Sequence, residues 1–158
     1  MNTPVAANAD LFLVVGYDGS PPSIRALDAA IRLLQGRSGS IDVVYVAHVP
    51  AVDMLSASAV AEMDASFDEV ERDLRASAGA QLEGREERWR FERGQGAITD
   101  QLLAAATNLR DEHPDDNVVI VVGSSSQAAH RLVGSVAVSL ARHSPVPLVI
   151  VQIGRAHV

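Results

Sequence analysis

The chain has 158 residues with 13 basic and 20 acidic side chains, a net charge of −7, and its length suits one domain with a complete core. The acidic balance argues against nucleic acid or an anionic membrane as the main partner, because phosphate groups require a basic surface. Cysteine is absent, which excludes disulfides, thiolate zinc sites and cysteine nucleophiles. The apolar runs fall far short of the ~20 residues that span a membrane, and residues 1–10 lack a signal-peptide pattern. We therefore expect a cytoplasmic protein.

The first half of the chain alternates apolar runs with helical patterns. Residues 1–10 are expected to form a flexible tail, and the apolar run 11–16 predicts a first strand. Ser20 is placed to cap a helix that has Pro21 in its first position and ends at Gly36. A second strand is expected over residues 41–49. Residues 51–84 hold a longer helix whose apolar residues fall on one stripe, with solvated acidic residues between them: Val60, Met63, Phe67, Val70 and Leu74.

The second half continues the same alternation. Residues 89–93 (WRFER) alternate apolar and charged side chains, which is typical of a strand near a sheet edge. Helical spacing of Ile98, Leu102, Ala105 and Leu109 predicts the next helix. The run 118–122 (VVIVV) predicts a strand buried on both faces. A helix over about 135–143, a strand over about 146–153 and a short tail over 154–158 complete the chain.

This order of elements predicts the fold class. Strands that alternate with amphipathic helices favour an α/β fold, a five-stranded parallel doubly wound sheet with helices on both faces, of the Rossmann-like type. Residues 11–153 would form its single domain. Ligands bind such sheets at the carboxyl ends of the strands, near the point where the strand order reverses. Three segments should meet there, at residues 17–19, 48–50 and 123–136.

The segment after the fourth strand is the strongest candidate for a ligand loop. Residues 123–126 read GSSS, and GSV follows at 134–136 where the next helix begins. A strand, a loop of small residues and a helix N-terminus together favour phosphate, because backbone N–H groups and the helix dipole attract anions. The alternative is a tight connection in which glycine serves the backbone alone.

Four motifs resemble those of the universal stress protein family. They are the opening VGYDGS at 15–20, the strand end VAHV at 46–49, the glycine-containing loop after the fourth strand, and PVPLVIV at 145–151. The resemblance extends over about residues 10–153 and implies a five-stranded α/β sandwich of the adenine-nucleotide alpha hydrolase-like type. Family members divide into those that bind ATP and those that do not.

The resemblance also implies a set of site residues. The ATP-binding motif is Gly-x-x-Gly, nine residues, then Gly-Ser or Gly-Thr. Gly123 matches its first glycine, but Ser126 replaces the second, and only seven residues separate Ser126 from Gly134. The loop is therefore a shortened, partly degenerate variant. By resemblance, nucleotide would contact these positions: Asp18, Val49, Gly123, Ser126, Gly134, Ser135 and Val136. The alternatives are a turn-forming and helix-capping role for Asp18 and core packing for Val49.

The resemblance and the missing catalytic patterns together give a functional expectation. No Gly-x-Ser-x-Gly elbow is present and no lysine follows the loop glycines, so we expect no enzyme and no catalytic residues. The expected ligand is ATP or AMP, with Mg²⁺ only together with nucleotide. The alternative is a family member without nucleotide or cofactor that acts through partner contacts, and a phosphate-transferring enzyme is a more remote reading. An apolar last strand at a sheet edge also predicts a homodimer through that strand.

Overall fold

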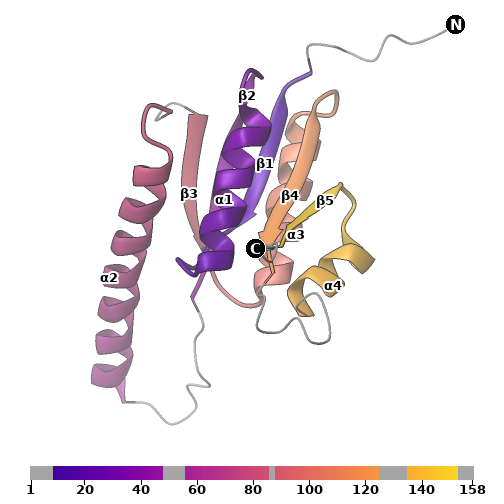
Figure 1. The fold of residues 1–158 in the computed structure, drawn as a ribbon. Helices are drawn as coiled ribbons and strands as arrows, with labels where there is room; N and C mark the ends of the chain where they lie inside the picture. The colour runs from indigo at the N-terminus through magenta and orange to yellow at the C-terminus, as the bar shows by residue number, and fades with distance from the viewer. Residues whose placement is uncertain (1–8, 48–55, 86–87, 125–134, 153–158) are drawn as a thin grey trace, which may run out of the picture.

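A computed structural model describes residues 9–47, 56–85, 88–124 and 135–152 of the chain. The chain forms one parallel five-stranded sheet in the order β3-β2-β1-β4-β5 (Figure 1). The elements are β1 (Leu11–Gly16), α1 (Pro21–Leu34), β2 (Gly39–Val46), α2 (Ala57–Gln81), β3 (Trp89–Gly94), α3 (Ile98–Glu112), β4 (Asn117–Gly123), α4 (Ser135–His143) and β5 (Leu148–Val151). The predicted fold class is confirmed.

The two faces of the sheet carry separate apolar cores, because successive strand residues point to opposite sides. Leu13 and Val15 of β1 pack with Leu27 of α1 and with Ala78 and Leu82 at the end of α2. Val14 and the buried residues of β4 on the other face, including Ile120, pack with Leu102 of α3 and Leu140 of α4. Helices α1 and α2 therefore cover one face and α3 and α4 the other, which is the predicted doubly wound arrangement.

The central strands are as buried as their apolar sequences predict. In β4, Val118, Ile120, Val121 and Val122 are buried and Val119 is half-buried. The alternating strand β3 lies at one edge of the sheet and β5 at the other, as expected. Residues 1–10 and 154–158, predicted to be tails, lie almost wholly outside the described residues.

The predicted bounds of two strands are wrong. The second strand begins earlier, at Gly39, and ends at Val46, with Ala47 outside it and residues 48–49 outside the described residues. The fifth strand is shorter than predicted, because Val146 belongs to a turn. The Ser144 hydroxyl donates to the Val146 carbonyl at 2.7 Å and accepts from its N–H at 3.2 Å. Pairing with β4 therefore starts at Leu148.

Candidate functional site

A cleft of about 490 Å³ opens at the carboxyl ends of the central strands. Its walls come from the ends of β1, β2 and β4, the first turn of α1, the N-terminal end of α3, and Val136 of α4. The strand order places it at the switch point, because the chain runs outward from β1 through β2 and β3 and then returns to β4 on the other side of β1. The cleft thus lies where the order of elements predicted a ligand site.

Asp18 stands at the end of β1 and is held by the turn that follows. The N–H of Ser20 donates to the Asp18 Oδ1 at 2.9 Å, and the Asp18 N–H donates to the Ser23 hydroxyl at 3.3 Å. Ser20 caps α1 and Pro21 begins it, as predicted. Asp18 therefore orders the turn before α1, whereas the cap that the alternative reading gave to Asp18 belongs to Ser20, and the Asp18 side chain lies at the cleft.

The charge of Asp18 is stabilised by the same turn. Partial burial raises the pKa of its carboxyl group, but hydrogen bonds from the side chain and backbone of Ser20 and from Ser23 outweigh that effect. The net result is a pKa below the ordinary value for an aspartate. Asp18 is therefore an anionic hydrogen-bond acceptor at neutral pH, placed to receive an N–H or O–H of a ligand.

Gly123 joins β4 to the start of α1 by close contact. A Cβ atom at this position would overlap the backbone carbonyl of Pro22, so no larger residue fits without movement. This supports the backbone explanation for this glycine. The close approach also brings the N-terminal turn of α1 against the end of β4, and this contact forms one wall of the cleft.

The predicted site residues divide into three groups. Asp18, Gly123 and Val136 line the cleft together. Ser135 is the exposed first residue of α4, beside Val136, but is not part of the lining. Val49, Ser126 and Gly134 lie outside the described residues, as does most of the loop with the GSSS sequence.

Sequence reasoning missed the N-terminal end of α3. Residues Gly96 to Thr99 line the cleft, as does Leu102 of the same helix. Ala97 at the N-cap makes no side-chain capping bond, so backbone N–H groups of the first turn remain directed to this end of the helix. The two glycines before the helix, Gly94 and Gly96, could have indicated this wall of the cleft. They lie where a parallel strand ends, at the same edge of the sheet as the other strand ends that line the cleft.

Comparison with known proteins gives the decisive observation. A sequence profile described as the universal stress protein family matches residues 13–152. The chain belongs to the universal stress protein family. The family predicted from the motifs is confirmed. A comparison with curated protein sequences finds no match.

Several solved structures share the universal stress protein fold with this chain. A universal stress protein in complex with cAMP is 25% identical, with a TM-score of 0.59, covering 92% of this chain and 99% of that chain. The universal stress protein UspA from Lactobacillus plantarum is 19% identical, with a TM-score of 0.65 and coverages of 90% and 98%. A family protein from Arabidopsis thaliana with AMP bound is 13% identical, with a TM-score of 0.60 and coverages of 92% and 93%. The last two likenesses show the fold alone.

The described part of the chain has neither a cluster of metal-ligating side chains nor a membrane-spanning helix. No group of three or more histidine, aspartate or glutamate side chains there is arranged to hold a metal ion. Among the same residues, no helix has both the length and the apolar character needed to cross a membrane.

Proposed function

We propose that this universal stress protein binds an adenine nucleotide in the cleft and acts as a nucleotide-responsive module of the stress response, without catalytic turnover. The observation that carries the proposal is the cleft at the switch point, which brings Asp18, the N-terminal end of α3, Gly123 and Val136 together. Its volume of about 490 Å³ lies within the range of roughly 300–1,000 Å³ common for small-molecule sites. A universal stress protein in complex with cAMP and a family protein with AMP bound support the choice of ligand class.

The variant loop sets the expected strength of binding. Ser126 replaces a glycine of the ATP-binding motif and the loop is two residues short, so fewer backbone N–H groups reach a phosphate. Each hydrogen bond lost to a charged group is worth about 1.5–3 kcal/mol. We therefore propose weaker binding than in members with the full motif, by about two decades or more if two such bonds are lost.

Calorimetric titration with ATP, ADP, AMP and cAMP tests the proposal. Thr99→Trp places a large side chain in the cleft lining and should abolish binding. Ala104→Trp is the matched control, since Ala104 is exposed elsewhere on α3 and does not line the cleft. Binding that survives Thr99→Trp, or no heat with any of the four nucleotides, would contradict the proposal. Phosphate release under saturating ATP would contradict the absence of turnover.

We further propose that the chain forms a homodimer through β5. The strand lies at the edge of the sheet, and its four apolar residues are all half-buried. The Pro147 carbonyl accepts a hydrogen bond from Ile120 of β4, and the Val151 carbonyl accepts one from Ser124, the residue after β4. By alternation, the N–H of Ile150 points to the open edge. This edge offers a strand of a second subunit both hydrogen-bonding groups and apolar surface.

A proline substitution tests the dimer without removing bonds to β4. Ile150→Pro deletes an outward N–H, whereas proline is tolerated at an edge strand. Light scattering should give a dimer mass for the wild-type chain at micromolar concentration and a monomer mass for the variant. A monomer mass for the wild type, or a dimer that persists in the variant, would refute pairing through β5. Neither result would bear on the proposal of nucleotide binding.

A further inference from the structure

Helix α2 is longer than the strand beside it. Its 25 residues correspond to about 37 Å, whereas the six residues of β3 correspond to about 20 Å. Figure 1 shows the N-terminal half of α2 running past the end of β3, away from the body of the sheet. Ala78, near the other end of the helix, is its one buried residue. The N-terminal half of α2 is therefore a projecting element.

One apolar stripe runs along α2 but is covered only in part. Val60, Met63, Phe67, Val70 and Leu74 repeat at alternating intervals of three and four, the spacing of a coiled-coil seam. Phe67 and Leu74 pack against the core next to α1. By contrast, Val60 is 38% exposed and Val70 is 42% exposed, and Leu33 of α1 is the other exposed large apolar side chain in the described part of the chain.

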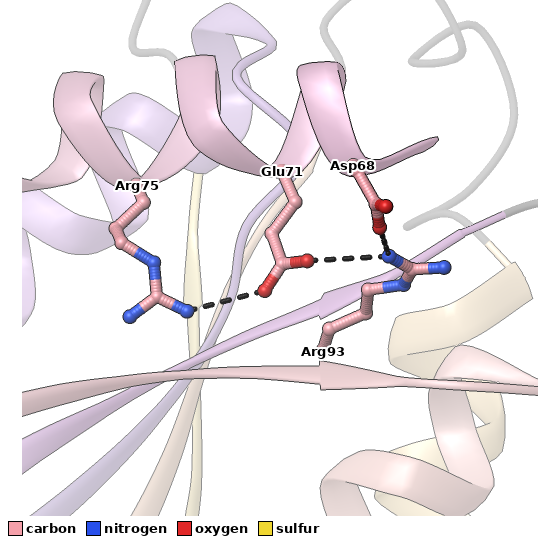
Figure 2. A network of polar contacts seen from close by, with 4 residues as sticks. All are labelled: Asp68, Glu71, Arg75 and Arg93. Carbon is pink, nitrogen blue, oxygen red and sulfur yellow. Dashed lines mark hydrogen bonds and ion pairs between the residues drawn. The ribbon is translucent and has the colours of Figure 1, made fainter. Parts of the chain in front are cut away.

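The helix is also acidic from its N-cap Ser56 to Glu71 and has no basic residue in that stretch. Between Ser56 and Glu71 the helix carries five carboxylates: Glu62, Asp64, Asp68, Glu69 and Glu71. Arg93 of β3 binds Asp68 at 2.7 Å and Glu71 at 3.2 Å, and Arg75 binds Glu71 at 3.1 Å (Figure 2). Glu62, Asp64 and Glu69 form no ion pair with any residue that the structure describes. The exposed part of the stripe is thus bordered by three carboxylates that have no ion-pair partner among the described residues.

We propose that this acidic stripe, formed by Val60, Met63 and Val70 with Glu62, Asp64 and Glu69, is the docking surface for a basic amphipathic helix of another protein. Apolar anchors at intervals of three and four would fill the seam, and lysine or arginine beside them would pair with the carboxylates. A second copy of the chain fits poorly, because it would bring its own carboxylates against these. The proposal is independent of nucleotide binding.

The probe is a fluorescent helical peptide of about three heptads, with leucine at the seam positions and lysine beside them. Its control has the same composition in scrambled order. The nucleotide-free protein should bind the amphipathic peptide more tightly than the scrambled one, and added salt should weaken binding. Val60→Gln with Val70→Gln should lower affinity by about tenfold or more, since both anchors are lost while charge is unchanged. Leu33→Gln, at the exposed apolar residue of α1, should leave affinity unchanged.

Each contrary result has a distinct meaning. Equal binding of the scrambled peptide, no binding of either peptide, or unchanged affinity in the double variant would overturn the proposal. The variant should also keep the mass of the wild-type protein and a Tm within about 2 °C of it. A lower mass would show that a second copy covers the stripe, and a large fall in Tm would show that the chain itself covers it. Either would also overturn the proposal.

Discussion

Gly123 joins two walls of the cleft, because its backbone lies against the carbonyl of Pro22. Gly123→Ala should lower the free energy of unfolding by about 1–3 kcal/mol, since the added methyl group must push α1 away from β4. Gly79→Ala is a contrasting control. Its methyl group would meet Trp89 at an ordinary 3.5 Å, and alanine should raise stability by about 0.5–1 kcal/mol within a helix. Urea denaturation measures both, and equal stability of wild type and Gly123→Ala would contradict the packing argument.

Asp18 gives a prediction about pH. Its folded-state pKa is lowered by hydrogen bonds from Ser20 and Ser23 that outweigh the effect of burial. A carboxyl group with a depressed folded pKa stabilises the fold above its unfolded pKa of about 4, and this stability is lost as pH falls through the folded value. The stability difference between wild type and Asp18→Asn should therefore be largest near neutral pH and shrink in acid. Thermal denaturation over pH measures it, and a difference that stays constant would count against the charged turn.

At the scale of elements, α2 is fastened to the domain by a polar network near its C-terminal end. The Tyr17 hydroxyl lies 2.8 Å from the Ser77 Oγ and donates to the Gln81 Oε1 at 3.1 Å. Gln81 in turn donates to the Ile24 carbonyl and to Asp28, both at 3.0 Å. Because Tyr17 also lines the cleft, this network joins the end of β1 to α2 and α1.

Tyr17→Phe tests how much that hydrogen-bond network contributes to the stability of the fold. Loss of the hydroxyl should lower the free energy of unfolding by about 1 kcal/mol, since Ser77 and Gln81 each lose a partner. Tyr45→Phe is the control, because the Tyr45 hydroxyl makes no hydrogen bond among the described residues and should cost much less. Chemical denaturation of the two variants compares them. A larger loss in Tyr45→Phe would show that the network does not fasten α2.

Local sequence signals predicted most of the helices and strands. They failed at positions whose structure depends on tertiary contacts. The apolar run of β1 and the helical pattern of α4 gave the observed bounds. The fifth strand was overextended, because Val146 looks like a strand residue and only the turn around Ser144 shows otherwise. The wall formed by Gly96 to Thr99 was missed, because α3 reaches the cleft only by crossing back over the sheet from an edge strand.

At the scale of the whole molecule, the order of strands places the cleft and decides which distant segments meet there. Alternating strands and helices predicted a switch point at β1 and β4, and Asp18, Gly123 and Val136 do meet there. The contributions of Val49, Ser126 and Gly134 stay predictions, because these residues lie outside the described structure. The family follows from motifs distributed over nearly the whole chain, whereas the nucleotide stays a proposal, because most of the loop expected to bind it lies outside the described residues.

The central claim is that an adenine nucleotide binds at this switch point, and an NMR titration tests it most directly. Backbone amide signals of a labelled protein would be followed while ATP, AMP or cAMP is added to millimolar concentration. We predict saturable shifts that are largest at Asp18, at the first turn of α3, and at Gly123 and Val136, which line the cleft. The absence of saturable shifts with all three nucleotides, or shifts that gather on another face, would contradict the account.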